Sequence, residues 1–312
     1  MKACAACHTD LPKDSYSKKQ WKLDEFQRRC KVCITDNREI QQPSQQNDDT
    51  NTSTNEIIKS INSICLEDDE KISDEELFKQ PPTEDCPICF LRMPYLGKGR
   101  RYQTCCGKVI CSGCVHAVEE SGAHSLCPFC RSPHPDSDKE MFKREKNRVK
   151  EKDDAQAMYN IGVYNSEGFH GYPQDYAKAL ELWHRSGERG YAGAYCSIGN
   201  AYQRGEGVKV DMKKAQYYYE LAALGGSASA RLNLGNIEIL TGNTERALKH
   251  YMVSVTGGND TCLKQIQHLF SQGRVTKQYY REAVRAYQEY LREIKSSQRD
   301  EAAAAHEDFR YY

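Results

Sequence analysis

The sequence predicts a multidomain protein in which small cysteine-rich α+β modules precede an all-α solenoid of helix-turn-helix repeats. Two observations predict this architecture. The chain has 15 cysteines in 312 residues, and most of them lie before residue 131 in pairs spaced Cys-x-x-Cys. Beyond residue 155, a pattern of alanine, glycine and aromatic residues recurs about every 36 residues, which is typical of stacked helical repeats.

The first module, residues 1–40, contains two Cys-x-x-Cys pairs. Cys4 and Cys7 form one pair, and Cys30 and Cys33 form the other. Two thiolates on one tight turn can both bind a tetrahedral zinc ion at about 2.3 Å, and a second pair completes the four ligands. The sequence therefore predicts one structural zinc ion in this module.

The same module resembles the Stc-one-type zinc domain in Leu11-Pro12, in the run from Ser17 to Trp21 and in the run from Arg28 to Cys33. The resemblance implies a role in bridging proteins. Basic residues around Trp21, within residues 18–31, would also suit nucleic acid through phosphate contacts and base stacking. We favour a structural interpretation, in which Trp21 and Phe26 form a miniature core, because so short a domain has few other apolar groups.

Residues 41–82 are expected to form a flexible polar and acidic linker. The first part, Gln41 to Asn55, is too polar to offset the entropy of ordering it. Apolar residues at helical spacing follow from Ile57 to Cys65, and then two acidic runs, Glu67–Glu70 and Asp74–Glu76. A short helix that docks on a partner is one interpretation of this part, and a solvated spacer is the one that we favour.

Residues 83–135 are the most cysteine-rich part of the chain. The eight cysteines there are Cys86, Cys89, Cys105, Cys106, Cys111, Cys114, Cys127 and Cys130. A disulfide framework would need an oxidising compartment, and Met1 is followed directly by Lys2, Ala3 and Cys4 with no apolar signal segment. We therefore expect reduced thiolates that bind zinc.

The order of these cysteines resembles that of RING fingers, as do the motifs Cys86-Pro-Ile-Cys89 and Cys127-Pro-Phe-Cys130-Arg131. The resemblance implies a cross-braced fold, in which alternate pairs share a zinc ion. The first zinc ion would then be bound by the first and third pairs, and half of the second site would come from the last pair. Carried onto this sequence, the ligands of the first ion are Cys86, Cys89, Cys111 and Cys114, and those of the half-site are Cys127 and Cys130.

The other half of the second site departs from the family pattern. RING fingers usually have a histidine where this chain has Lys108, and an ammonium group offers no lone pair. We expect Cys105 and Cys106 to bind together, since adjacent Cα atoms lie about 3.8 Å apart and sulfurs on a tetrahedral zinc ion are separated by a similar distance. His116 and His124 remain alternative ligands.

RING fingers of ubiquitin ligases hold a charged ubiquitin-conjugating enzyme in a reactive pose and form no covalent intermediate, so their contribution is positioning. The resemblance assigns docking positions to Ile88, Val118 and Pro128. Val118 stands where the family often has tryptophan. Arg131 matches the arginine that bridges the conjugating enzyme and ubiquitin, a task suited to a planar guanidinium with five donors.

The last part of the chain is expected to be helical throughout. A connecting helix over residues 136–154 precedes about four repeats over 155–295 and a tail, 296–312, that extends the last helix or frays. The motifs Ala157–Gly162, Ala194–Gly199 and Ala230–Gly235 resemble Sel-one-like repeats, relatives of the tetratricopeptide class. The resemblance implies a groove for a protein partner, and the three glycines fit places where two helices approach closely.

The composition of the chain argues against some classes of binding partner and against a membrane-spanning protein. The 44 basic and 44 acidic residues leave no net charge for capture of nucleic acid or an anionic bilayer by the whole chain. No apolar run approaches the roughly 18 residues of a membrane span. We expect an intracellular protein, in the cytoplasm or nucleus, with three zinc ions.

The functional expectation is a RING-type ubiquitin ligase that docks a conjugating enzyme on the finger and recruits a protein substrate through the repeats. The alternative is a non-catalytic, zinc-dependent adaptor in protein assemblies, including those on chromatin or RNA. The adaptor is favoured by the two departures from the family pattern at Lys108 and Val118.

Overall fold

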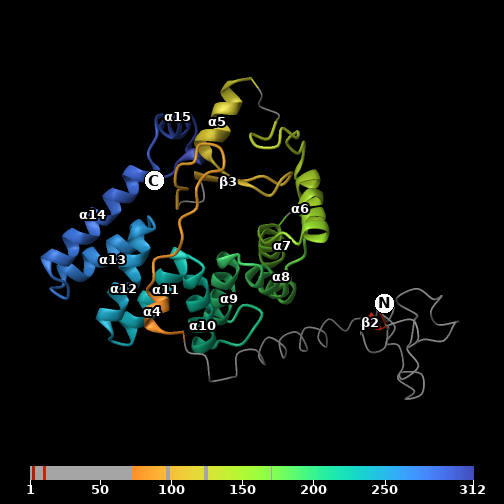
Figure 1. The fold of residues 1–312 in the computed structure, drawn as a ribbon. Coiled ribbons are helices and arrows are strands. Elements are labelled where there is room, and N and C mark those ends of the chain that lie inside the picture. Colours follow the sequence, from red (N-terminus) through yellow and green to blue (C-terminus); the bar gives the residue numbers. More distant parts are fainter. Residues whose placement is uncertain (1, 4–9, 12–71, 96–98, 123–125, 170) are drawn as a thin grey trace, which may run out of the picture. The chain divides into compact units, whose positions relative to one another are not determined.

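A computed structural model describes residues 2–3, 10–11, 72–95, 99–122, 126–169 and 171–312 (Figure 1). The chain divides into two compact units, Met1–Ser53 and Thr54–Tyr312. In the first unit, strands β1 (Lys2–Ala3) and β2 (Asp10–Leu11) pair antiparallel with Lys2 opposite Leu11. The four cysteines of this unit, Trp21 and the basic residues within 18–31 lie outside the described residues.

The cysteine-rich module of the second unit is a small α+β fold. Strands β3 (Arg100–Tyr102) and β4 (Val109–Cys111) form an antiparallel hairpin with Arg100 opposite Cys111. Helix α5 (Ser112–Glu120) follows β4 directly. Ile110 and Val115 are buried and pack with the cysteines in one apolar cluster, so the hairpin and the helix share a core that includes the candidate metal ligands.

Helix α6 (Asp138–Lys152) leads from this module into an array of helices (Figure 1). The array consists of four successive helix pairs, which confirms the expected all-α solenoid. Most of these helices begin at Ser, Thr, Asp or Asn, whose side chain accepts a backbone N–H of the first turn. The pairs are α7 (Ala155–Glu167) with α8 (Tyr176–Glu188), α9 (Ala192–Arg204) with α10 (Met212–Leu224), α11 (Ala228–Leu240) with α12 (Thr244–Thr256), and α13 (Asp260–Ser271) with α14 (Lys277–Ile294).

The recurring glycines lie where the two helices of a repeat touch. A Cβ on Gly199 would lie 2.5 Å from the ring of Tyr219, and one on Gly235 would lie 2.2 Å from the ring of Tyr251. Gly162 meets a tryptophan, Trp183, in the same way, at 2.5 Å. The expectation of close helix approach at these glycines is therefore confirmed, and it explains why an aromatic residue recurs in the second helix of the first three repeats.

Residues 72–82 do not behave as a flexible linker, so the expectation is wrong for this part of 41–82. They include a short helix, α4 (Asp74–Leu77), which packs on α10. Leu77 is fully buried in the main apolar cluster of the solenoid, and Ile72 and Phe78 pack against it. The acidic residues around these three apolar side chains made the segment look like a solvated linker in the sequence, whereas it packs on the solenoid.

The C-terminal tail is also ordered, against the expectation that it extends the last helix or frays. Helix α14 ends at Ile294, and a separate helix, α15 (Ser297–Ala305), begins after the cap Ser296. Helix α15 and the short 3-10 helix η3 (Glu307–Phe309) pack back on α5. Arg299, Ala302 and Tyr311 are almost completely buried by this packing.

No helix in the described part of the chain has both the length and the apolar character to cross a membrane.

Candidate metal centre

The first and last Cys-x-x-Cys pairs of the finger sit on turns of the same construction. The N–H of Cys86 donates to Leu91 O and the N–H of Phe90 donates to Cys86 O, both at 2.9 Å. The last pair repeats this pattern, with Cys127 N–H donating to Ser132 O at 2.8 Å and Arg131 N–H donating to Cys127 O at 3.0 Å.

The residue after each pair adopts a left-handed conformation, with φ of 58° at Phe90 and 61° at Arg131. Residues other than glycine rarely adopt this conformation without a reason. Two matching turns therefore present two pairs of sulfurs in the same way.

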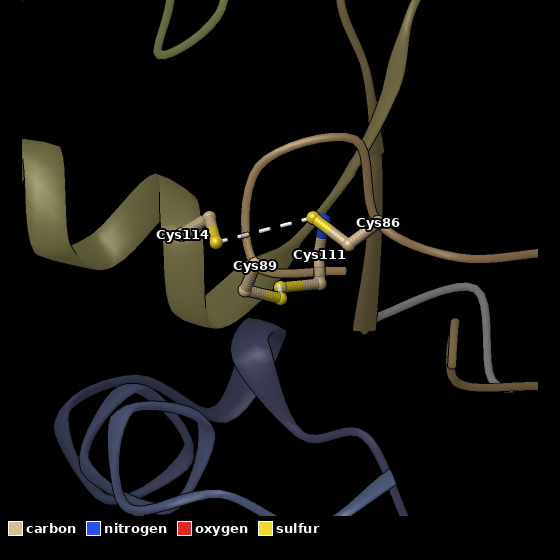
Figure 2. A group of neighbouring side chains, drawn as sticks. All are labelled: Cys86, Cys89, Cys111 and Cys114. Atoms are coloured by element: carbon tan, nitrogen blue, oxygen red, sulfur yellow. Dashed lines mark hydrogen bonds between the residues drawn. The ribbon is translucent and has the colours of Figure 1, made fainter. Parts of the chain in front are cut away.

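Four cysteines converge at the first turn (Figure 2). They are Cys86 and Cys89 from the turn, Cys111 at the end of β4 and Cys114 in the first turn of α5. The sulfurs of Cys86 and Cys114 are 3.9 Å apart, and those of Cys89 and Cys111 are 3.7 Å apart. Sulfurs bound at about 2.3 Å to one tetrahedral zinc ion would be separated by about 3.8 Å.

Four further cysteines converge at the last turn, namely Cys105, Cys106, Cys127 and Cys130. The sulfurs of Cys106 and Cys127 are 3.9 Å apart, and those of Cys105 and Cys130 are 3.4 Å apart. The structure thus brings the adjacent cysteines into one group, as the sequence analysis expected.

The other residues considered for the second group lie elsewhere or cannot be placed. Lys108 points its ammonium group over the ring of Phe129, 5.8 Å from the centroid. His116 packs on Phe309, with 6.0 Å between the ring centroids. His124 lies outside the described residues.

The chemistry of both groups suits a thiophilic divalent cation. All four donors of each group are thiols, and zinc takes such a set with tetrahedral geometry. Burial, together with the neighbouring Cys127, raises the pKa of Cys106 to about 11. Without a cation Cys106 therefore keeps its proton at neutral pH, whereas a bound divalent cation would stabilise its thiolate. The residues present fit zinc in both groups.

The residues assigned to docking come from three elements around these groups. Ile88 lies in the first turn and packs on the apolar cluster of the finger, and Val118 lies on α5; both are half-buried. Pro128 is half-buried in the last turn, and Arg131 is exposed directly after it. Their role in docking stays a prediction.

Two exposed phenylalanines in the same turns were missed by the sequence analysis. Phe90 follows the first pair and is 77% exposed, and Phe129 lies within the last pair and is 44% exposed. Large apolar side chains at the surface often belong to an interface. Their position one residue from a candidate metal-binding cysteine was the available signal.

A third missed residue is Arg299 of α15, which reaches the first cysteine group. Its guanidinium donates to Arg92 O at 2.8 Å and to Ile294 O at 2.7 Å, and it approaches the sulfur of Cys89 at 3.8 Å. Arg299 is 1% exposed. It places a positive charge beside four thiols that would carry net negative charge around a zinc ion.

Comparison with known proteins supports the repeat assignment. The model of the Sel1 repeat family matches residues 155–191 and 192–227, which cover the first two helix pairs of the solenoid. A crystal structure of a Sel1 repeat protein from Oxalobacter formigenes is 24% identical, with a TM-score of 0.44, and the match covers 62% of this chain and 72% of that one. The family model thus identifies Sel1 repeats in residues 155–227, as the resemblance implied.

Short segments of the chain are also similar to plant proteins. Over 53 residues it is 42% identical to the E3 ubiquitin-protein ligase DA2 of Arabidopsis thaliana, which covers 16% of this chain and 12% of that protein. Over 52 residues it is 38% identical to the E3 ubiquitin-protein ligase GW2 of Oryza sativa subsp. indica, covering 16% and 11%. Over 101 residues it is 32% identical to HRD3B of Arabidopsis thaliana, an ERAD-associated E3 ubiquitin-protein ligase component, covering 32% and 16%. The matched segments are thus a small part of each relative.

Proposed function

We propose that this protein is a RING-type ubiquitin ligase, whose finger docks a ubiquitin-conjugating enzyme and whose Sel1 repeats hold a protein substrate. Zinc in the finger would be structural, and the finger would supply no nucleophile. Its contribution to the reaction would be to hold the charged conjugating enzyme in a reactive pose.

The interleaved grouping of the cysteines carries this proposal. The first Cys-x-x-Cys pair groups with Cys111 and Cys114, and the last pair groups with Cys105 and Cys106, so the two groups alternate along the chain. Alternation of this kind distinguishes a cross-braced finger from two zinc modules in series. The short matches to plant E3 ligases agree with the proposal.

The turns that hold the cysteines offer a surface on which a conjugating enzyme can dock. Ile88 and Pro128 supply apolar contacts in the two turns, and the exposed rings of Phe90 and Phe129 extend them. Arg131 follows the last turn with an exposed guanidinium that can donate to two acceptors at once. The two turns thus combine apolar anchors with one planar donor.

A non-catalytic adaptor is the second candidate, and Val118 favours it. This side chain is half-buried on α5 and offers much less area than the tryptophan that the position often carries. Burial of about 25 cal/mol per Å² of apolar area sets the scale of docking strength, so a smaller residue weakens it.

An autoubiquitination assay with the zinc-loaded full-length protein and a panel of conjugating enzymes tests the ligase proposal. Ile88→Ala should reduce ubiquitin transfer about tenfold, because it removes roughly 1–2 kcal/mol of apolar contact. Arg131→Ala should also reduce transfer. Leu240→Ala is the matched control, since Leu240 is an 84% exposed apolar residue at the end of α11, and it should leave transfer unchanged.

Failure of every conjugating enzyme to produce ubiquitin chains with folded, zinc-loaded protein would leave the adaptor as the remaining candidate. An active protein whose transfer is unaffected by both Ile88→Ala and Arg131→Ala would show that the enzyme docks elsewhere.

A further inference from the structure

The segment Ile72–Pro82 occupies a surface of the solenoid in the manner of a bound peptide. It makes one helical turn, α4, which Ser73 caps by accepting the N–H of Glu76 at 3.2 Å, and then runs on without regular structure. We call the surface beneath it the α10–α12 surface, because residues of these three helices form it. They are Ala223 on α10, Arg231 on α11, and Arg246, Lys249 and His250 on α12.

Arg231 of α11 holds the backbone of the segment. Its guanidinium donates to Leu77 O at 2.9 Å and to Lys79 O at 3.4 Å, and also to Ala223 O of α10 at 3.1 Å. Arg231 is 1% exposed, and its Nε has no hydrogen-bond partner among the described residues. A buried guanidinium that binds the carbonyls of a peptide is a costly group to keep unless the surface serves to hold one.

Phe78 inserts its ring into a basic cradle. The ring centroid lies 4.7 Å from that of His250, and the charged groups of Arg246 and Lys249 lie 5.3 and 5.8 Å from the Phe78 centroid. Arg246 also pairs with Asp74, in the first turn of α4. Cations over an aromatic face attract it, so this cradle favours an aromatic side chain carried by an acidic segment.

The contacts together recognise a short sequence pattern, an acidic turn followed by Leu77 and Phe78. Leu77 fills the apolar cluster, Phe78 fills the basic cradle, and the acidic first turn of α4, residues 74–76, faces a surface that carries arginine and lysine. Backbone carbonyl capture, two side-chain pockets and complementary charge are the means by which grooves recognise peptides. The occupant is a short segment of the chain, Ile72–Lys79, so a partner with the same pattern can compete for the site.

We propose that the α10–α12 surface binds a short acidic turn ending in Leu-Phe on a partner protein, and that Ile72–Lys79 is its tethered occupant. The tether gives the internal segment a high effective concentration, so the partner binds only when the segment is released or outcompeted. This inference names the partner chemistry of the substrate-holding repeats in the proposed function, but it does not depend on ligase activity.

Peptide binding in trans tests the inference. The probe is a fluorescent peptide with the sequence of residues 72–82, titrated against the full-length protein and followed by anisotropy. The double variant Leu77→Ala/Phe78→Ala empties the site and should bind the peptide at least tenfold more tightly than the wild type, which carries its own occupant. A peptide in which the Leu-Phe pair is replaced by two alanines should bind the variant at least tenfold more weakly.

Arg246→Gln in the emptied protein should weaken the peptide about tenfold, while Lys264→Gln, an exposed lysine of α13, should leave binding unchanged. A folded double variant that does not bind the peptide would overturn the inference.

Hydrogen exchange of the wild type decides the question even if the double variant does not fold. The amides of Leu77 and Phe78 are bonded to Ser73 O and Asp74 O, so they exchange only when the segment opens. They should exchange at least a hundredfold faster than the amides of the solenoid core, because the segment detaches by itself. Exchange only through global unfolding would mean that the segment is a fixed part of the solenoid, and the inference would fail.

Discussion

Replacement of Arg299 should damage the finger, although Arg299 lies 210 positions after Cys89, whose sulfur it contacts. Its guanidinium donates to the carbonyl of Arg92 at 2.8 Å, to that of Ile294 at 2.7 Å and to that of Leu91 at 3.4 Å. It also approaches the sulfur of Cys89 at 3.8 Å. Arg299 therefore links helix α15 to the turn that carries Cys86 and Cys89.

The expected cost follows from these contacts. In Arg299→Ala at least two buried carbonyl oxygens lose a charged donor, and each unsatisfied group costs about 1–3 kcal/mol. Because such losses are not fully additive, we expect the finger and α15 to be destabilised by roughly 3–5 kcal/mol in total. Removal of a group that contacts a metal ligand typically lowers metal affinity by about 10–100-fold, and the long contact to the sulfur of Cys89 places this case near tenfold.

Urea unfolding of the zinc-loaded protein and competition for zinc with a chromogenic chelator measure the two effects separately. Arg292→Ala is the matched control, because Arg292 is an exposed arginine on α14 whose ion pair is with Glu289. Suppose that Arg299→Ala has the same urea midpoint for unfolding of the finger as the control, and a zinc affinity within twofold of it. Then α15 and the turn that carries Cys86 and Cys89 are not coupled.

The remaining predictions concern the metal, the solenoid core and pH. Chelation of zinc should unfold the finger, since each structural zinc ion contributes about 10 kcal/mol or more, while circular dichroism retains most of the helical signal of the repeats; loss of the whole helical signal would contradict this. Gly235→Ala should destabilise the solenoid by about 1–3 kcal/mol, because the added Cβ would lie 2.2 Å from Tyr251. Gly257→Ala, whose nearest neighbour would be 3.3 Å away, is its control in thermal unfolding. Burial, with Arg231 and Arg246 nearby, lowers the pKa of His250 from 6.5 to about 3. Below pH 6.5 His250 is therefore protonated in the unfolded chain but remains neutral in the folded chain. Stability should therefore fall as the pH drops from 6.5 towards 3, by about 2 kcal/mol at pH 5, and His250→Leu should remove this part of the pH dependence in urea unfolding at pH 7 and 5; equal slopes for the two proteins would refute the assignment.

The sequence predicted those features that local spacing encodes. Six of the finger's cysteines group as the family pattern implied, and Cys105 and Cys106 enter the second group together, as their spacing indicated. The glycines of the repeats face aromatic rings because the two helices of one repeat are close in sequence. In both cases the partners of a residue lie within about 45 positions, so periodicity and spacing reveal them.

The sequence analysis missed contacts between distant parts of the chain. Leu77 lies in an acidic stretch, and its burial depends on α10 and α11 about 150 positions later. Arg299 lies in a polar, alanine-rich stretch, and its partners are about 200 positions earlier. One apolar or basic residue in a polar segment has no periodicity, so only the folded chain shows where it packs.

Native mass spectrometry of cysteine variants of the full-length protein tests the interleaved metal sites most directly. Cys86→Ser/Cys111→Ser changes two residues of one group, and Cys86→Ser/Cys106→Ser changes one residue in each group. If the sites are interleaved, the first variant loses one zinc ion relative to the wild type and the second loses two. Loss of two ions from the first variant and one from the second would contradict the cross-brace and, with it, the RING assignment.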